Sequence, residues 1–114
     1  KSKIQAYIEK HIKNVRIASE LTRSETSWFG VPIICDTKEI KQKLVSHLES
    51  NNVQTRNYFA GNILLHPAYT HLDDWRKYPN ANTVLDTVFF IGCSPQYSEK
   101  ELNYLEEVIS SFSG

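Results

Sequence analysis

The segment 54–62 carries the side chains of this sequence that are best suited to binding a polar ligand. Its chemistry-bearing residues are Arg56, Asn57, Tyr58, Phe59, Gly61 and Asn62. A guanidinium forms paired hydrogen bonds with phosphate or carboxylate oxygens, and two carboxamides offer donors and acceptors to hydroxyls and carbonyls. The two rings add apolar contact area, and the glycine permits a close approach of the backbone to a ligand. The alternative is a structural role, in which Arg56 pairs with an acidic residue and the two rings pack in the core. Composition alone favours this structural role.

Two further sets of residues carry chemistry. The side chains that suit zinc are those of His66, His71, Asp73 and Asp74. Their spacing matches no helical or hairpin ligand pair, so a polar loop surface is the better interpretation and we predict no metal site. Cys35 and Cys93 each end an apolar run, and no neighbouring base or helix N-terminus is visible that would lower a thiol pKa. We therefore interpret both cysteines as small buried side chains that stay reduced.

Length and composition limit the class of protein. The chain has 114 residues, of which 40% are hydrophobic, and its 13 basic and 13 acidic residues give no net charge. This is enough for one domain with a core of its own, whereas a balanced charge argues against nucleic acid or an anionic membrane as partner. No apolar run approaches the roughly 20 residues of a membrane span. The chain begins with lysine and has no leader signature, so we expect a segment of a longer polypeptide.

Periodicity and capping signals predict the elements that position these residues. Thr37 precedes an apolar helical pattern as a cap, Ser98 and Glu101 form a capping box, and Gly30 and Pro32 mark a bulged or edge strand. In chain order we expect a helix over 4–15, a linker over 13–25, a strand over 28–35, a helix over 37–50, a strand over 53–58, a loop over 63–80, a short helix over 82–85, a strand over 88–93 and a helix over 98–112. The expected fold class is α/β (α+β), a small three-stranded sheet with the helices 37–50 and 98–112 packed on one face.

Four sequence motifs are similar to those of a known family. They are Ser-Trp-Phe-Gly-Val-Pro-Ile over 27–33, Thr-Arg-Asn-Tyr-Phe-Ala-Gly-Asn over 55–62, His-Pro-Ala-Tyr over 66–69 and Phe-Ile-Gly-Cys-Ser-Pro over 90–95. Together they resemble the C-terminal small domain of the DegT/DnrJ/EryC1/StrS family of PLP-dependent sugar-nucleotide enzymes. The sequence of 57–62 is similar to that of the 3-dehydratase branch of the family. Aminotransferases of the family carry a His-Tyr-Pro type sequence at the corresponding place. The resemblance covers 27–112 and departs from that branch at 93–94 and 96–97.

The resemblance implies a fold, a domain division and an activity. Residues 1–26 would be an N-terminal helix and linker from the preceding domain, and 27–114 the small domain of a fold-type I PLP-dependent enzyme. The implied function is that of a CDP-4-dehydro-6-deoxyglucose 3-dehydratase-like enzyme, which acts in 3,6-dideoxyhexose and lipopolysaccharide O-antigen biosynthesis in the cytoplasm. A sugar-nucleotide aminotransferase of the same family is one alternative, and a stand-alone α/β ligand-binding or dimerisation module is another.

The resemblance also implies a cofactor, partners and site residues. Pyridoxal 5'-phosphate or pyridoxamine 5'-phosphate would act as the electron sink, held mainly by a large domain whose histidine or lysine separates dehydratase from aminotransferase. The fragment alone would contain no catalytic residue and be inactive. Its part would be to bind the nucleotide-sugar substrate through Arg56, Asn57, Tyr58, Phe59, Asn62 and His66. Asn62 would bond the substrate or order the loop. The implied assembly is a homodimer, with an iron–sulfur reductase as a further partner.

Overall fold

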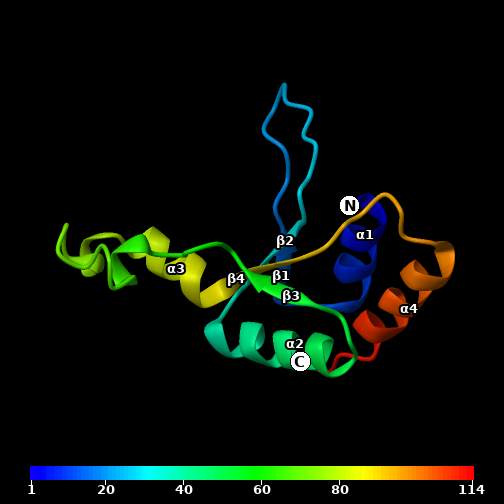
Figure 1. The fold of residues 1–114 in the computed structure, drawn as a ribbon. Helices are drawn as coiled ribbons and strands as arrows, with labels where there is room; N and C mark the ends of the chain where they lie inside the picture. Colours follow the sequence, from blue (N-terminus) through cyan, green and yellow to red (C-terminus); the bar gives the residue numbers. More distant parts are fainter.

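The computed structural model describes residues 1–114 and contains four helices, four strands and two 3-10 turns (Figure 1). In chain order these are α1 (Ser2–His11), β1 (Val15–Ile17), β2 (Val31–Cys35), α2 (Lys38–Ser50), β3 (Thr55–Asn57), η1 (Ile63–Leu65), η2 (Trp75–Lys77), α3 (Pro79–Thr87), β4 (Val88–Ile91) and α4 (Glu99–Ser110). The mixed α/β class predicted from the sequence is confirmed, and so are the three predicted strands.

The sheet has four strands rather than the predicted three, in the order β1-β2-β4-β3, and every neighbouring pair is antiparallel. The additional strand is β1, which pairs Val15 with Cys35 and Ile17 with Ile33. The prediction of a helix over 4–15 was therefore wrong after His11, where α1 ends, and the prediction of a linker over 13–25 was wrong at residues 15–17. A strand of three residues leaves too short an alternation to be seen without its partner.

β2 lies inside the sheet, although Pro32 had indicated a bulged or edge strand. The carbonyl of Pro32 accepts a hydrogen bond from the backbone N–H of Ala18 at 3.2 Å, so the nitrogen of Pro32 faces β1 and no bond to β4 is lost. The Ala18 carbonyl, which an ordinary residue at 32 would bond, accepts from the Lys1 ammonium at 2.7 Å instead. A lysine donor thus replaces the bond that proline cannot make.

The two long helices begin where their capping signals predicted. The Thr37 hydroxyl accepts from the backbone N–H of Ile40 at 3.2 Å, and Ser98 and Glu101 complete their capping box. α3 differs from the prediction because it begins at Pro79 rather than at Asn82. Proline at the first helical position has a suitable φ and no N–H that needs a partner.

One core joins the sheet to α1, α2 and α4. Strand alternation directs Val31, Ile33 and Cys35 of β2, with Phe89 and Ile91 of β4, to the same face, where they pack against buried residues of the three helices. The helical members of this core are Ile4, Ile8, Leu44, Leu48, Leu105, Val108 and Ile109. The prediction that α2 and α4 cover one face is confirmed, and α1 covers it with them.

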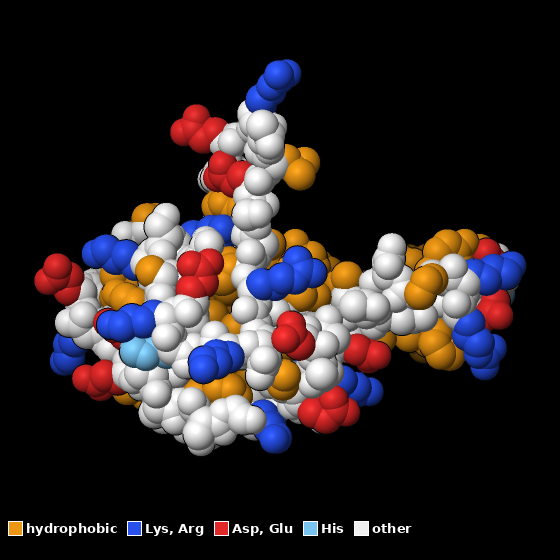
Figure 2. All heavy atoms as spheres, turned by 180° about the vertical axis from the view of Figure 1, so that it is seen from behind, with side chains coloured by type: hydrophobic (Ala, Val, Ile, Leu, Met, Phe, Trp, Pro, Cys, Tyr) orange, Lys and Arg blue, Asp and Glu red, His pale blue; other side chains and the backbone are white.

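Two segments project from this layered body. Residues 18–30 form a long connection between β1 and β2, and residues 63–78, which include η1 and η2, extend away from the sheet beyond α3 (Figure 1). Both stand clear of the main body in the space-filling view, and apolar side chains gather at the far end of the second (Figure 2). No helix of the chain is long and apolar enough to cross a membrane.

Candidate ligand-binding face

The sheet face opposite the helices is here called the open face. Register and alternation assign it to the residues Arg16, Pro32, Ile34, Val88, Phe90 and Arg56. Its centre, formed by β2 and β4, is apolar, and each edge strand contributes one arginine. The face carries no acidic residue of the four strands, so it is positively charged in a chain of zero net charge.

Four aromatic rings pack together on the open face. The ring of Phe90 lies 5.7 Å from that of Phe29, 6.0 Å from that of Phe59 and 6.2 Å from that of Tyr58, measured between centroids. Phe29 precedes β2, whereas Tyr58 and Phe59 follow β3, so this aromatic cluster lies between the bases of the two projections. Phe29 and Phe59 remain 80% and 71% exposed. Rings stacked on a sheet and open to solvent are available to a ligand or a partner.

Sequence reasoning placed Tyr58 and Phe59 in the site but missed Phe29 and Phe90. Phe90 belongs to the run Val-Phe-Phe-Ile over 88–91, which is apolar at every position and so does not reveal which side chains face outward. Only the register that sets Phe90 opposite Pro32 and Arg56 brings it to the open face. Phe29 joins it through a contact between distant segments, for which the sequence gives no local signal.

Arg56 and Asn57 lie on opposite faces of the sheet, although they are neighbours in the predicted site. Arg56 pairs with Phe90 across the ladder, is exposed, and takes part in none of the four ion pairs of the chain. Asn57 pairs with Phe89, which belongs to the core. The alternative that Arg56 is paired with an acid finds no partner in the chain, so its guanidinium is free to meet a ligand.

Asn62 is 2% exposed, and its carboxamide bonds three groups of the chain. Its Nδ2 donates to the Trp75 carbonyl at 3.1 Å and to Asn82 Oδ1 at 2.7 Å, and its Oδ1 accepts from the backbone N–H of Leu64 at 3.1 Å. Asn62 was expected either to bond the substrate or to order the loop, and these contacts fit the second role. They tie the start of the 63–78 projection to η2 and α3.

Gly61 and His66 also lie in this region. Gly61 has a φ of +63°, and a Cβ there would lie 2.7 Å from the Cβ of Leu85. The close approach that was expected toward a ligand is thus made to α3, where only glycine fits. The side chain of His66 is exposed on the projection directly after η1 and makes no hydrogen bond within the chain. The structure therefore brings together Arg56, Tyr58 and Phe59, and not all six predicted residues.

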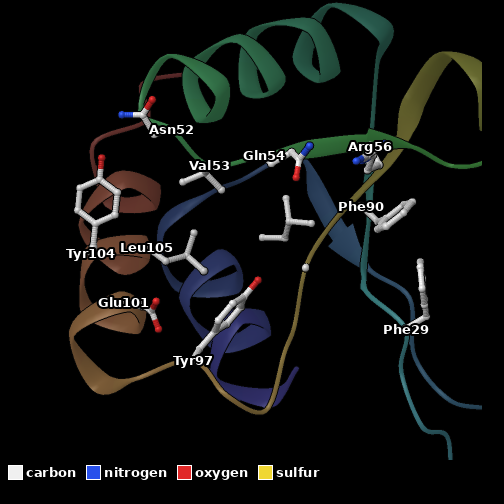
Figure 3. Close-up of a pocket in the computed structure, with 12 residues that line it drawn as sticks. Phe29, Asn52, Val53, Gln54, Arg56, Phe90, Tyr97, Glu101, Tyr104 and Leu105 are labelled. Carbon is white, nitrogen blue, oxygen red and sulfur yellow. The ribbon is translucent and has the colours of Figure 1, made fainter.

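A cavity of about 450 Å³ adjoins Arg56 at the end of the sheet, between β3, β4 and α4 (Figure 3). Tyr97 and Gln54 point into it from opposite sides, and Leu105 of α4 lines it as well (Figure 3). Phe29 and Phe90 line both this cavity and a smaller hollow of about 80 Å³ beneath the aromatic cluster. The two spaces are therefore adjacent, with Arg56 on the wall of the larger one. The sequence analysis gave Tyr97 no part in the site, and it included Gln54 only as the first residue of the 54–62 segment.

Two buried groups with reactive side chains lie on the helix-covered side. Burial raises the pKa of the Cys35 thiol to about 11, which keeps the thiol neutral at physiological pH. Burial also lowers the pKa of Lys41, whose ammonium donates to the Leu85 carbonyl at 2.8 Å, near the C-terminus of α3. A cation at that end of a helix offsets the helix dipole. Cys35 is thus the small buried side chain that was predicted, whereas Cys93 is only partly buried.

Of the residues considered for metal binding, Asp73 is engaged by its neighbours. Its carboxylate accepts from Lys77 Nζ at 2.8 Å, from the Tyr78 hydroxyl at 2.8 Å and from the backbone N–H of Asp74 at 2.7 Å. These donors, the lysine above all, lower the pKa of Asp73 to about 2. No group of three or more His, Cys, Asp or Glu residues gathers in the chain.

Curated proteins with similar sequences include two sugar-modifying proteins. The chain is 34% identical over 97 residues to the dTDP-4-dehydro-2,6-dideoxy-D-glucose 3-dehydratase of Saccharopolyspora spinosa, which covers 78% of this chain and 20% of that protein. It is 29% identical over 100 residues to the lipopolysaccharide biosynthesis protein RfbH of Salmonella typhimurium, which covers 81% of this chain and 22% of that protein. The chain thus spans about a fifth of the length of these relatives.

Solved structures share the fold. The aminotransferase TlmJ from Streptoalloteichus hindustanus matches with a TM-score of 0.76 at 15% identity, over 96% of this chain and 29% of that one. A GDP-4-keto-6-deoxymannose-3-dehydratase with a trapped PLP-glutamate geminal diamine matches with a TM-score of 0.67 at 24% identity, over 95% and 28%. Residues 1–111, which include α1 as well as the four motifs, match the family as a whole. The chain belongs to the DegT/DnrJ/EryC1/StrS aminotransferase family.

Proposed function

We propose that this chain is the C-terminal small domain of a PLP- or PMP-dependent sugar-nucleotide 3-dehydratase, and that its open face forms one wall of the substrate cleft. The observation that carries the proposal is the meeting of Arg56, Tyr58 and Phe59 at one exposed place on the open face. It is supported by the names of two relatives, a sugar 3-dehydratase and a lipopolysaccharide biosynthesis protein. The domain boundary at residues 26 and 27 stays a prediction.

The side chains of β3 suit an extended, partly charged ligand. Arg56 lies at the middle of β3, and Gln54 and Tyr58 flank the strand on either side of it. In the proposed site Arg56 contacts an anionic or hydroxylated part of the substrate, and Tyr58 and Phe59 pack against the sugar or cofactor ring. The cavity beside Arg56 leaves room for a further part of a sugar nucleotide.

Asn62 and His66 have lesser parts in this proposal. Asn62 holds the loop that presents the rings, because its carboxamide makes three hydrogen bonds within the chain. His66 is exposed on the 63–78 projection, and we assign it a contact at the edge of the cleft. Asn57 is also exposed, but it lies on the opposite face of the sheet from Arg56, so we assign it no contact with the substrate. The homodimer, the iron–sulfur reductase and the cytoplasmic location stay predictions.

The residues of this chain do not form an anchor for the cofactor. Neither the cavity nor the aromatic hollow is lined by a lysine, and the amine of the buried Lys41 is bonded to Leu85. When bound, PLP or PMP would supply an electron sink for loss of the sugar 3-hydroxyl, and we assign its anchoring to the remainder of a longer protein. In this proposal residues 1–114 supply no catalytic group, so the isolated chain should be inactive.

An aminotransferase of the same family is the second candidate, because the family to which the chain belongs is described as an aminotransferase family. A stand-alone ligand-binding or dimerisation module is a third alternative. The experiment that separates them incubates the full-length protein with PMP, glutamate and a 4-keto-6-deoxy sugar nucleotide, with and without a one-electron reducing system. Dehydratase chemistry gives a product that has lost oxygen, whereas transamination gives one that has gained nitrogen. Mass spectrometry distinguishes them, and an unchanged substrate in both arms would overturn the proposal.

A further inference from the structure

Trp28, the residue before Phe29, lies between the aromatic cluster and the start of α1. It is half-buried and lines two spaces, the hollow beneath the aromatic cluster and a polar cavity of about 570 Å³ beside the first turn of α1. A residue on the wall of both spaces can transmit a change on the α1 side to the rings of the open face. The groups that hold Trp28 therefore bear on the geometry of the candidate site.

Three groups from different parts of the chain hold Trp28. Lys1 Nζ lies 4.0 Å from the centroid of the indole ring, which is the geometry of a cation–π contact. The indole Nε1 donates to Oε1 of Glu20 at 3.3 Å, and the Trp28 carbonyl accepts from the Cys93 thiol at 3.4 Å. The side chain is thus held by a cation at its face and by a carboxylate at its edge, while the thiol holds its backbone.

Lys1 is the group that connects Trp28 to the sheet. The same ammonium donates to the Ala18 carbonyl at 2.7 Å, in place of the bond that Pro32 cannot make. It takes part in none of the four ion pairs of the chain, so the carbonyl and the indole ring are the two partners that hold it. Loss of this ammonium would release the 18–30 projection at both of its ends, at Ala18 and at Trp28.

Phe29 and Gly30 carry the position of Trp28 into the aromatic cluster. The ring of Phe29 lies 5.7 Å from that of Phe90 and 6.4 Å from that of Phe59, measured between centroids. A Cβ at Gly30 would lie 2.6 Å from Cδ2 of Phe90, so the backbone at Gly30 already touches the sheet and is a fixed point. Trp28 is the other support of Phe29. A shift of Trp28 therefore moves the ring of Phe29, and with it the surface on which Phe59 packs.

We infer that Lys1 is a positioning residue for the candidate site. It holds Trp28 through the cation–π contact, Trp28 fixes Phe29, and the ring of Phe29 sets that of Phe59. Lys1 acts in this way without touching the substrate. The inference rests on the proposed function, because Phe59 is one of the two rings proposed to pack against the sugar or cofactor ring. It adds to the site a residue that precedes α1 and lies outside the four sequence motifs.

The test compares two substitutions of Lys1 in the full-length protein. Lys1→Met keeps the length of the side chain and removes the charge, whereas Lys1→Arg keeps a cation that can lie over an indole ring and donate to a carbonyl. Lys1→Met should raise KM for the nucleotide sugar by about two- to fivefold, the effect of one cation–π contact, and change kcat by less than about twofold. Lys1→Arg should recover most of this loss. Lys3→Met is the matched control, because Lys3 is exposed on the first turn of α1 and is not among the groups that hold Trp28.

A second measurement reports on the ring of Phe59 without substrate or cofactor. The full-length protein with Phe59→4-fluorophenylalanine gives a ¹⁹F NMR resonance from that ring. Lys1→Met should shift or broaden this resonance, Lys1→Arg should largely restore it, and Lys3→Met should leave it unchanged. Trp28→Phe is measured alongside, in case Lys1→Met does not fold. It keeps a ring but loses the bond to Glu20 and weakens the cation–π contact, so it should act in the same direction as Lys1→Met.

The two measurements separate the possible outcomes. An unchanged fluorine resonance in these variants would overturn the inference, because the ring of Phe59 would then be held without Lys1. A changed resonance with an unchanged KM would overturn it as well, because Lys1 would then have no effect on substrate binding. If the unsubstituted protein does not turn over the sugar nucleotide, the proposed function has failed, and the fluorine resonance still decides whether Lys1 positions the ring.

Discussion

Replacement of Arg56 by alanine tests the proposed substrate contact most directly. The structure leaves its guanidinium exposed, opposite Phe90 and outside every ion pair of the chain. A charge-assisted hydrogen bond to substrate is worth roughly 1.5–3 kcal/mol. Its loss in Arg56→Ala should therefore lower kcat/KM by between about tenfold and about a hundredfold.

Stability should hardly change in the same variant. Exposed side chains without a partner contribute within about 0.5 kcal/mol to the free energy of unfolding. The pKa of Glu49 is lowered mainly by hydrogen bonds from Thr55, and the charge of Arg56 is the smallest of its causes. The expected result is thus a large loss of turnover with an unchanged Tm. If Arg56 had a structural role, the variant would instead have a lower Tm and an unchanged turnover.

The assay measures kcat/KM and Tm on one preparation of the full-length enzyme, together with two further variants. Arg56→Lys should recover part of the loss, because an ammonium keeps the charge without the forked geometry. Arg23→Ala removes an exposed arginine at the far part of the 18–30 projection and should change kcat/KM by less than about twofold. If Arg56→Ala lowers Tm and leaves kcat/KM unchanged, Arg56 has no place in the site.

Three other predictions concern the fold around the site. Asn62→Ala should lower the free energy of unfolding in urea by roughly 1–3 kcal/mol, because it leaves the buried backbone N–H of Leu64 without its partner and removes two part-buried hydrogen bonds, and an unchanged value would contradict the network described. The carboxyl of Asp73 should titrate near pH 2 by NMR, and Lys77→Ala should move the midpoint toward 3.8; this contribution to stability is complete above pH 3.8 and is lost as pH falls through about 2. The thiol of Cys35 should resist iodoacetamide at pH 8 until the protein unfolds; because its folded pKa is about 11 against 9.0 unfolded, its contribution to stability is complete below pH 9 and is lost as pH rises through about 11. Rapid labelling of folded protein at Cys35 would contradict the burial.

Elements with local signals could be predicted from the sequence. α2 and α4 have an apolar stripe at helical spacing and a capping residue at the start, and both lie where these signals indicated. β1 has neither, since three residues flanked by polar chain show no period. It exists because Val15 and Ile17 can complete the core beside β2, and that reason is visible only once β2 is in place.

The residues of the candidate site also divide into what the sequence could predict and what only the structure reveals. Composition alone favoured a structural role for 54–62, and the family resemblance predicted a substrate-binding loop. The loop carries Arg56, Tyr58 and Phe59 to one exposed place. The sequence did not separate these from Asn62 and Gly61, whose type and spacing fit a ligand site equally well. What separates them is the position of α3, which supplies Asn82 as a partner and Leu85 as a close contact.

The residues that bind and the residues that hold the loop therefore share one short segment for a physical reason. A loop that presents rings and a guanidinium to a cleft must itself be fixed, or the entropy of ordering it would be lost from binding. Asn62 and Gly61 fix the loop through their contacts with α3. The neighbouring residues on the open face can then remain without partners inside the chain. Weakening the Asn62 network should therefore raise KM for the nucleotide sugar, because the loop becomes disordered. Arg56→Ala, in contrast, should act only through the lost contact. The two variants then differ in temperature dependence, because only the effect of Asn62→Ala should shrink on cooling as the loop becomes ordered again.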